Sequence, residues 1–595
     1  MKSRLAYLIR FYLLTILVFM MAKWLFMLCN VFEGSFSFGD MFAVLWHGFS
    51  LDSSMALYLF ALPLLIVMAS VWVRLPRWFM KPYYVFIAIA MALAFVADTS
   101  MYPFWHFKLD ASWLQYLETP TEAMASVSVG YIVVRVLVTI LLAYLVYLLY
   151  DKVVGLPKSQ GHWWEQFLYL LLIPVVIIGI RGGLGEATTN IGQVYFSQNQ
   201  FLNHAAVNPI FSFFYSLAHP MDDLKQFEFY PQEECEELTQ DVYTTESIDN
   251  DTLLTTTRPD ILIVLMESAG EALGSAMPHL QELKNEGIYF SRCYANSWRT
   301  DRGTVSALSG YPALPTVSVM KIPEKSRTMP SIAKTLVQQG YETSFLYGGD
   351  INFTNMRSYL ISTGWAQLTS MEDFSVKEQR SGQWGVQDHI TFRRVYDMIT
   401  HADTTRHHLW GFSTLSSHQP WEVPFHKLPD EVENSFCYLD SCINDFVIRL
   451  KQTPRWKNML IVLVADHGII HGEIDQMRPL QKNHIPLLMI GGAVRRPRVV
   501  ETLCNQSDLP AILFGQLRLN HDDFTFSRDV LSKTYTYPVV IHNYTNAQWI
   551  CDSTGHLLYD FDVRQLQVNE CSDAEHLNCL NKAIVQRLTT DFQNR

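Results

Sequence analysis

Thr300 is the residue whose position most directly predicts chemistry. It lies between two arginines, at the start of a run of small residues with helical character. The first turn of a helix carries unpaired backbone N–H groups and the positive end of the helix dipole, so it favours an anion. A hydroxyl in that position can attack a phosphorus atom while the developing charge is stabilised. The alternative is that Thr300 simply caps the helix, a position that threonine often occupies.

Three further polar side chains follow predicted strands. Glu267 comes after the aliphatic run 260–266, and Asp466 and His467 come after the similar run 459–465. The carboxyl ends of parallel strands meet at one edge of a sheet, where binding sites form. Two carboxylates, an imidazole and the Thr300 oxygen suit Mn²⁺, Mg²⁺ or Zn²⁺, and a bound metal would lower the pKa of the hydroxyl. Taken alone, Asp466-His467-Gly468 could instead be a polar strand end followed by a turn glycine.

His418 follows another short apolar run, 408–413, and is therefore predicted at the same edge. An imidazole there could stabilise a phosphate oxygen or protonate a leaving group. The alternative is a histidine on a surface loop.

The elements that position these residues alternate along the chain. Further strands are predicted at 343–347 and 485–490, and helices at 328–339 and 434–451. This alternation predicts a mostly parallel α/β sheet with helices on both faces. The last part, 534–595, indicates a short strand segment followed by a helix near 574–592.

The N-terminal part has a different character. Hydrophobic residues make up 49% of the chain and charged residues 17%, and the apolar runs are concentrated before about residue 183. Each run is close to the ~20 residues that cross a bilayer as a helix, and a first run followed by others is not a signal peptide. The five predicted spans are 5–28, 50–73, 82–100, 129–150 and 164–181.

The basic residues predict the orientation of these spans. Lysines and arginines precede the first span and lie between the second and third and between the fourth and fifth, whereas the alternate loops have few. By the positive-inside rule the N-terminus is cytoplasmic. An odd number of spans then places the rest of the chain outside a bacterial cell (inner) membrane.

The expected organisation has three parts: 1–183, the five-span domain; 184–257, a juxtamembrane segment with an acidic, mobile linker at 231–257; and 258–595, an extracytoplasmic catalytic domain. The formal net charge of −12, without a Lys/Arg-rich run, argues against nucleic acid as a partner.

Taken together, the ordered motifs resemble the lipoteichoic acid synthase family, which comprises membrane-anchored phosphoglycerol transferases of the alkaline phosphatase/sulfatase superfamily. The resemblance also covers the five spans before the outer domain. The motifs are Glu267, Arg299-Thr300-Asp301-Arg302-Gly303, Ser309-Gly310-Tyr311-Pro312, Gly348-Gly349-Asp350, Asn355-Met356-Arg357, Trp384-Gly385-Val386, Ser417-His418-Gln419-Pro420 and Ala465-Asp466-His467-Gly468.

The resemblance implies an alkaline-phosphatase-like (sulfatase-like) domain with one divalent metal, Mn²⁺ in preference to Mg²⁺ or Zn²⁺, bound by the residues matching Glu267, Thr300, Asp466 and His467. It implies that Thr300 accepts glycerophosphate from phosphatidylglycerol. The acceptor would be an extracytoplasmic glycan, a glycolipid or a growing glycerophosphate chain. The residues expected to contact the substrate are His418, Arg357, Asp350 and Arg302.

Four alternatives remain at this point. A phosphoethanolamine transferase acting on lipid A or an envelope glycan has a similar plan. A sulfatase is disfavoured because Thr300 does not lie in the Cys/Ser-x-Pro-x-Arg pattern that sulfatases need. A degenerate sensor would have lost part of the metal set. A transporter is a poor match to five spans without paired broken helices.

Overall fold

The structure is a computed structural model of the chain and describes residues 2–76, 78–105, 108–111, 129–155, 162–218, 224–243, 251–469, 471, 482–544, 547–561 and 563–595. By its internal contacts the chain divides into two compact units, Met1–Met221 and Asp222–Arg595, which are described separately.

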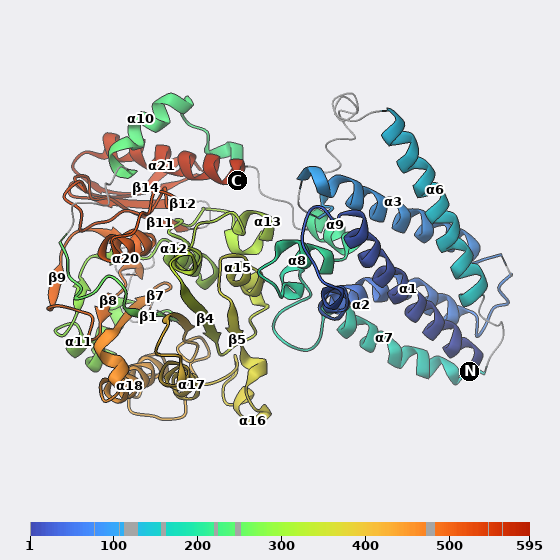
Figure 1. The fold of residues 1–595 in the computed structure, drawn as a ribbon, viewed down its shortest axis with the longest axis horizontal. Coiled ribbons are helices and arrows are strands. Elements are labelled where there is room, and N and C mark those ends of the chain that lie inside the picture. The colour runs from blue at the N-terminus through green and yellow to red at the C-terminus, as the bar shows by residue number, and fades with distance from the viewer. Residues whose placement is uncertain are drawn as a thin grey trace. The chain divides into compact units, whose positions relative to one another are not determined.

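Unit 1 is built from long apolar helices (Figure 1). Among the described residues, four helices are long and apolar enough to cross a membrane. A fifth, α7, has 17 residues, about 25 Å at ~1.5 Å per residue against a hydrocarbon core of ~30 Å, so the fifth span stays a prediction. The helices are α1 (Lys2–Cys29), α2 (Phe38–Ala69), α3 (Lys81–Trp105), α6 (Val129–Leu149), α7 (Glu165–Arg181), α8 (Gln200–Ala206) and α9 (Pro209–Ala218).

Helix α2 begins 12 residues before the predicted start of the second span, because Ser37 and Asp40 form a capping box that starts the helix there. Charged side chains inside unit 1 are paired. Asp52 lies 2.8 Å from Lys23, and Asp98 binds Lys108. These pairs agree with the cost of leaving a charge uncompensated in an apolar region.

Unit 2 is centred on an eight-stranded sheet of order β5-β4-β6-β1-β7-β8-β2-β9. The five strands from β5 to β7 are parallel, and β8 runs antiparallel to both of its neighbours. The strands are β1 (Asp260–Met266), β2 (Ile288–Phe290), β4 (Tyr341–Tyr347), β5 (Gln367–Thr369), β6 (His407–Ser413), β7 (Met459–Ala465), β8 (Leu487–Ile490) and β9 (Arg498–Val500).

The central strands β1 and β7 consist almost entirely of Ile, Leu, Val and Met, and every residue in both is buried. Such runs are typical of strands covered on both faces. Figure 1 shows α11, α17 and α18 on one side of the sheet and α12 and α20 on the other. Helices of unit 2 include α11 (Pro278–Leu283), α12 (Thr300–Ser309), α14 (Ile332–Gln338), α15 (Met356–Ser362), α17 (Asp388–His401), α18 (Glu431–Lys451) and α20 (Leu509–Leu517).

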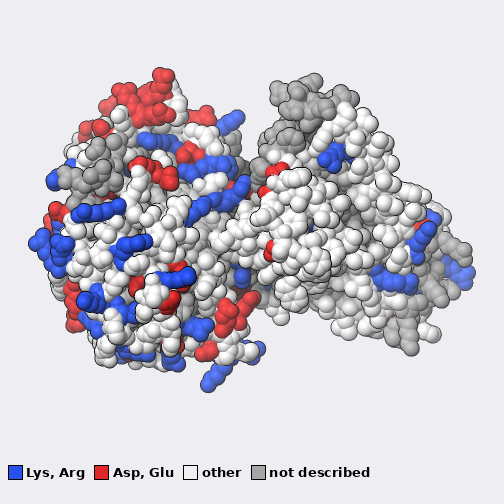
Figure 2. Space-filling view, in the orientation of Figure 1, with Lys and Arg blue, Asp and Glu red and all other residues white. Residues whose placement is uncertain are grey.

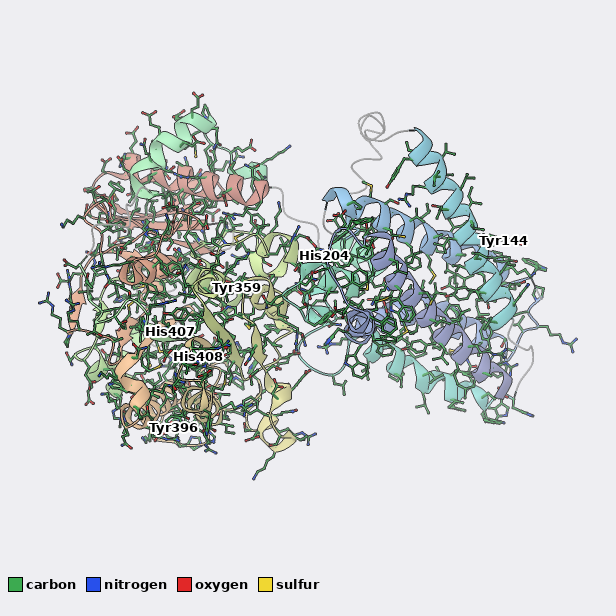
Figure 3. The ribbon with its side chains drawn as sticks, in the orientation of Figure 1. Tyr144, His204, Tyr359, Tyr396, His407 and His408 are labelled. Atoms are coloured by element: carbon green, nitrogen blue, oxygen red, sulfur yellow. The ribbon has the colours of Figure 1, made fainter. Side chains whose placement is uncertain are left out.

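Helix α12 is held at its far end by α15. The hydroxyls of Ser309 and Tyr359 lie 2.8 Å apart, and both side chains are buried; Tyr359 is labelled in Figure 3. The C-terminal end of the helix that begins with Thr300 is therefore anchored to α15.

The C-terminal part forms a second, antiparallel sheet covered by a helix. The strand segment predicted for 534–571 is a four-stranded sheet of order β11-β12-β13-β14, and the predicted helix is present. These elements are β11 (Val540–Tyr544), β12 (Ala547–Asp552), β13 (Gly555–Asp560), β14 (Gln565–Cys571) and α21 (Ala574–Asn594). β3 (Cys293–Tyr294) and β10 (Cys504–Asn505) form a separate short parallel pair.

The expectation of a mobile linker at 231–257 is wrong for its described residues. Helix α10 (Gln232–Tyr243) packs on α21, and the Arg587 Nη1 donates to the Thr239 hydroxyl at 2.8 Å. Its buried residues, Cys235, Thr239 and Val242, repeat at helical spacing, so one face of this acidic segment is apolar enough to pack.

The surfaces of the two units differ in charge. In Figure 2, lysine, arginine, aspartate and glutamate are spread over unit 2, whereas the visible face of unit 1 is largely uncharged. This contrast is expected when one unit faces lipid and the other faces water.

A buried ion pair provides a test of the packing in unit 2. Arg528 donates from Nε and Nη2 to the two oxygens of Asp508 at 2.9 and 2.7 Å, and both side chains are almost fully buried. We expect Asp508→Ala to lower the free energy of unfolding by about 3–5 kcal/mol, because it leaves a buried guanidinium uncompensated. Urea titration of the detergent-purified chain, followed by tryptophan fluorescence, measures this change.

The matched control is Glu342→Ala, which removes an exposed partner of Arg406. Exposed pairs contribute about 0–1 kcal/mol, so this variant should unfold close to the wild type. Equal effects of the two substitutions would contradict the prediction.

Candidate metal and nucleophile site

Glu267, Asp466 and His467 lie together at the carboxyl edge of the sheet, as predicted. Met266 of β1 pairs with Ala465 of β7, so the residues that follow these two strands are neighbours. The His467 Nε2 lies 3.7 Å from an oxygen of each carboxylate, and one possible ligand atom from each of the three residues lies within 4.8 Å of the others.

Hydrogen bonds orient these three side chains. The backbone N–H groups of Ser268 and His467 both donate to Asp466 Oδ1 at 2.8 Å, which leaves Oδ2 buried and without a partner among the described residues. The His467 Nδ1 donates to the Gly468 carbonyl at 3.1 Å, so the Nε2 lone pair faces the carboxylates. An orphaned buried carboxylate oxygen and an inward-facing imidazole nitrogen fit a divalent cation.

Thr300 is the first residue of α12, and its hydroxyl is directed at this cluster. The Oγ1 donates to Glu267 Oε2 at 3.2 Å and lies 3.5 Å from His467 Nε2. The helix is capped by Arg299, whose side chain makes no capping hydrogen bond. Thr300 therefore does not act as the helix cap, and its oxygen is available to the cluster.

Gly303 lets α12 approach the cluster closely. A Cβ atom built on this residue would lie 2.0 Å from the Asp466 carbonyl oxygen. Only a residue without a side chain permits this approach, which places the first turn of the helix against the end of β7.

Burial and mutual repulsion shift the proton affinities of the site. Burial and the nearby Glu267 carboxylate raise the pKa of Asp466 to about 7. Burial on its own would lower the pKa of His467, but the carboxylates of Asp466 and Glu267 outweigh it and raise the pKa. The negative charge is therefore only partly balanced within the protein, as expected for a cation site.

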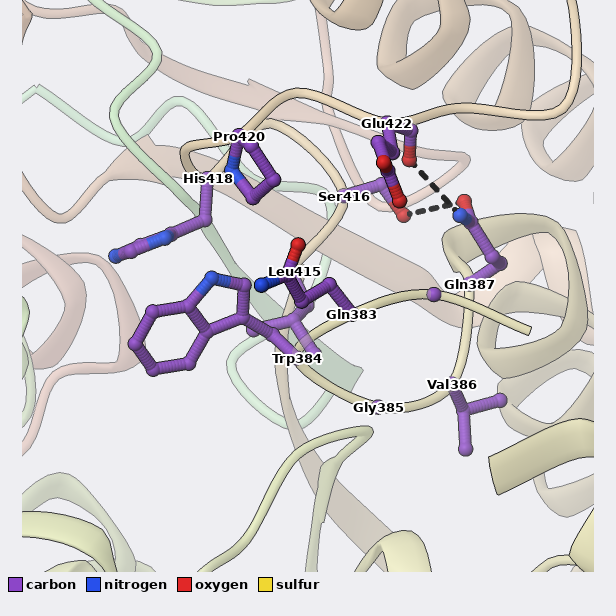
Figure 4. A pocket seen from close by; sticks show the side chains of 11 residues that line it. Gln383, Trp384, Gly385, Val386, Gln387, Leu415, Ser416, His418, Pro420 and Glu422 are labelled. Carbon is purple, nitrogen blue, oxygen red and sulfur yellow. Dashed lines mark hydrogen bonds between the residues drawn. The ribbon is translucent and has the colours of Figure 1, made fainter. Parts of the chain in front are cut away.

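His418 lines a pocket formed by two loops (Figure 4). Its ring lies 4.3 Å from the Trp384 ring, between centroids, and both residues hydrogen-bond the Gln419 carbonyl. The preceding loop is tied to the end of β1, because the Ser417 hydroxyl donates to the Glu267 carbonyl at 2.7 Å. His418 is thus held on a loop that contacts the end of β1.

Arg357 and Asp350 lie near the same pocket and share a partner. The Arg357 Nε donates to Asn352 Oδ1 at 2.8 Å, and the Asn352 N–H donates to Asp350 Oδ1 at 3.0 Å. Their loop packs against the pocket through Phe353, whose ring lies 6.1 Å from that of Trp384. The motifs that contain Asp350 and Arg357 therefore lie close to the motif that contains Trp384.

Arg302 is placed differently from the prediction. Its guanidinium donates to the carbonyls of Leu314 and Pro315 at 2.9 and 3.1 Å, and also to that of Thr316. Because these bonds order the loop after α12, its observed contacts are structural. A direct contact with substrate stays a prediction.

Two further histidines follow His467 in the sequence and have partners outside the cluster. His471 lies 3.3 Å from Asp430 at the start of α18, and the His484 Nε2 donates to the Ser291 carbonyl at 2.9 Å.

Residues 259–519 match the sulfatase family profile. This part of the chain is similar to sulfatases and is called the sulfatase-like domain below. This domain contains the cluster, Thr300 and the His418 pocket. The match extends over the eight-stranded sheet and ends before the C-terminal antiparallel sheet.

Individual relatives are distant. A phosphoglycerol transferase I of Xanthomonas campestris is 22% identical over 285 residues, 43% of this chain and 39% of that protein. A lipoteichoic acid synthase-like protein of Bacillus subtilis is 24% identical over 326 residues, 48% of this chain and 52% of that protein. The chain therefore spans about half or less of the length of these curated relatives.

A solved structure shares the fold. A protein in the alkaline phosphatase superfamily from Vibrio parahaemolyticus is 24% identical, with a TM-score of 0.54, over 62% of this chain and 98% of that one. The sulfatase-like domain thus has the alkaline-phosphatase-like fold that the motifs implied.

The sequence did not identify His542, which belongs to β11 of the second sheet and contacts the sulfatase-like domain. Its Nδ1 donates to the Ala295 carbonyl at 2.7 Å, and its Nε2 is buried without a partner among the described residues. Burial, together with the positive charges of Lys482 and His467, lowers the pKa of His542 to about 3. The ring is neutral, and no local pattern in the sequence marks its distant partner.

The sequence also did not identify Lys482 as a residue near the site. Its Nζ lies 5.5 Å from the centre of the Trp298 ring and 5.9 Å from that of Tyr544. Burial lowers the pKa of Lys482. The side chain follows neither a strand nor a motif, so only the fold brings this cation beside the turn that precedes Thr300.

We predict that Gly303→Ala disrupts the site. The added methyl group cannot fit beside the Asp466 carbonyl, so α12 must move, at a cost of about 1–3 kcal/mol. We expect a lower melting temperature and loss of the stabilisation that Mn²⁺ gives, measured by thermal unfolding with and without the metal.

Gly274→Ala is the control, since the nearest atom to its added methyl is the end of the flexible Gln281 side chain. An Mn²⁺-dependent melting shift that survives in Gly303→Ala would show that the close approach is not required.

We also predict that metal affinity rises with pH. The Asp466 carboxyl, with its pKa raised to about 7, must lose its proton before it can bind a cation. One such proton predicts roughly tenfold weaker Mn²⁺ binding at about pH 6 than at about pH 8. Calorimetric titration of the metal-free chain tests this, and equal affinities at the two pH values would refute it.

Proposed function

We propose that the chain is a membrane-anchored phosphoglycerol transferase. It moves glycerophosphate from phosphatidylglycerol to an extracytoplasmic glycan or glycolipid acceptor. The observation that carries this proposal is the Thr300 hydroxyl at a helix N-terminus, hydrogen-bonded to Glu267 within the cluster. The names of the distant relatives give independent support.

Thr300 is the proposed nucleophile in two displacements. Its oxygen attacks the donor phosphorus, the bond from phosphorus to the diacylglycerol oxygen breaks, and the threonine proton ends on that oxygen. An acceptor hydroxyl then attacks the glycerophosphoryl-threonine, the bond from phosphorus to the Thr300 oxygen breaks, and the proton of the acceptor hydroxyl passes to that oxygen. Each displacement inverts the phosphorus, and attack from a fixed helix terminus avoids the entropic cost of orienting the nucleophile.

Glu267, Asp466, His467 and the Thr300 oxygen would hold one divalent metal, Mn²⁺ in preference to Mg²⁺ or Zn²⁺. When bound, the metal would acidify the hydroxyl and balance the charge on phosphorus-bound oxygens. The protein prepares for it by holding both carboxylates in place with backbone and hydroxyl donors.

His418, Arg357 and Asp350 are the proposed contacts of the glycerophosphate group. A guanidinium forms two parallel hydrogen bonds with a phosphate, and a neutral or charged imidazole can donate a third. Asn352 already fixes the Arg357 side chain through Nε, which leaves the other guanidinium nitrogens to bind a ligand. For Arg302 the proposed role is to support the first turn of α12 through its loop contacts.

The proposed location follows from the apolar helices of unit 1. They would anchor the chain in the bacterial cell (inner) membrane with the N-terminus in the cytoplasm and unit 2 outside. The donor lipid and the site would then face the same aqueous compartment.

Mass spectrometry of peptides tests the reaction. We expect the purified full chain, incubated with Mn²⁺ and a mixed lipid extract, to carry a glycerophosphate adduct on the peptide containing Thr300. Thr300→Ala should lose the adduct and all transfer while keeping its melting temperature, since the change leaves no core cavity.

Thr405→Ala, at an exposed position in a turn, is the matched control and should retain both. A phosphoethanolamine adduct at Thr300 would keep the nucleophile and change the donor. Transfer by Thr300→Ala at the wild-type rate would refute the proposed mechanism.

A further inference from the structure

Unit 1 contains a large cavity among its helices. It has a volume of about 830 Å³ and lies between α2, α3, α7 and α9. Ligand pockets commonly measure about 300–1,000 Å³, so this cavity is large enough for a ligand with long apolar chains. Its wall is mostly aliphatic and aromatic, with contributions from Leu59, Phe86, Met91, Ile177 and Phe214.

The walls of this cavity are firmly packed on one another. A Cβ atom on Gly179 of α7 would lie 2.3 Å from the Leu57 side chain of α2. Next to it, the Ser54 hydroxyl donates to the Ile180 carbonyl at 2.8 Å. Helices α2 and α7 are therefore in direct contact at Ser54, Leu57, Gly179 and Ile180. The cavity does not arise from loose packing of these two helices.

One cation lies in the wall of the cavity. Arg181, the last residue of α7, donates to the carbonyls of Gly183, Gly185 and Glu186, all neutral acceptors. Among the described residues no carboxylate forms an ion pair with it. Its positive charge therefore has no counter-charge among the described residues, and the exposed Thr188 adds a hydroxyl to the same wall.

An apolar cavity with one uncompensated cation in its wall matches a molecule with apolar chains and one anionic group. A water-soluble anion would leave the aliphatic wall unfilled, and a neutral lipid would leave the guanidinium without a counter-charge. Arginine binds phosphate through several directed hydrogen bonds, which makes a phosphate the favoured anion.

We propose that this cavity binds one anionic phospholipid, with its acyl chains along α2, α3 and α9 and its phosphate at Arg181 and Thr188. The site lies in unit 1 and requires no reaction at Thr300. It therefore goes beyond the proposed transferase activity and can be tested apart from it.

Native mass spectrometry of the full chain in detergent measures the binding. The Thr300→Ala background excludes turnover of the lipid. We expect one retained phosphatidylglycerol, and roughly tenfold weaker retention of phosphatidylcholine with the same acyl chains, because the net negative charge of the lipid faces the guanidinium. Glycerol phosphate, which has no acyl chains, should not compete.

Two variants separate the parts of the site. Arg181→Gln should remove the preference for phosphatidylglycerol and leave weak binding of both lipids. Ala90→Trp, at an exposed position in the wall, should fill the cavity and abolish retention of both. The control is Arg135→Gln, which removes an arginine of α6 that is not part of the wall and should leave binding unchanged.

An unchanged preference in Arg181→Gln, or retained lipid in Ala90→Trp, would overturn the proposal. So would equal retention of the two lipids by the unsubstituted cavity, which indicates only the general lipid layer around a membrane helix. Because binding is measured without catalysis, a failed transfer assay has no bearing on these outcomes.

Discussion

The central physical constraint on unit 2 is the burial of two carboxylates beside each other. Glu267 and Asp466 are 3% and 0% exposed, at the ends of adjacent strands. Two such charges repel and have lost most of their hydration, so they persist only when donors, a proton or a cation compensate them. The backbone N–H groups, the serine hydroxyl and the imidazole around them supply part of this compensation, and the remaining oxygen of Asp466 is left for a cation.

The C-terminal sheet contributes to this arrangement although it lies outside the sulfatase match. The Gln506 side chain accepts from the Asn296 N–H at 2.8 Å and donates to the carbonyls of Ala465 and Asp466. The Asn543 N–H of β11 donates to the Asn296 carbonyl at 2.8 Å. One buried amide network thus joins the end of β7, the segment before Thr300 and the second sheet.

The sequence was most informative where burial leaves a simple pattern. The uninterrupted aliphatic runs predicted β1 and β7 with their observed bounds, and hence the meeting of Glu267, Asp466 and His467. The direction of a strand was harder to infer. The run at 485–490 forms β8, which is antiparallel to β7, and a short run of apolar residues has the same pattern in a parallel and an antiparallel strand.

Another error arose where several charged residues in a segment concealed its few apolar positions. Four glutamates favoured a solvated linker at 231–257, although one face of that segment is buried. The role of His542 was not predictable, because its partner is the backbone of Ala295, 247 residues away, and no local spacing encodes such a contact. Likewise, nothing near Arg302 in the sequence indicated that its guanidinium would bind the carbonyls of residues 314–316.

The packing of α10 on α21 has a consequence for how unit 2 could be detached from its anchor. The Gln586 side chain accepts from the N–H groups of Phe229 and Tyr230 and donates to the Tyr230 carbonyl, while the Cys235 thiol donates to the Ala583 carbonyl. These bonds join the segment before β1 to the last helix of the chain. A protease that cut once between α10 and β1 would therefore produce a nicked two-fragment complex, not a released enzyme.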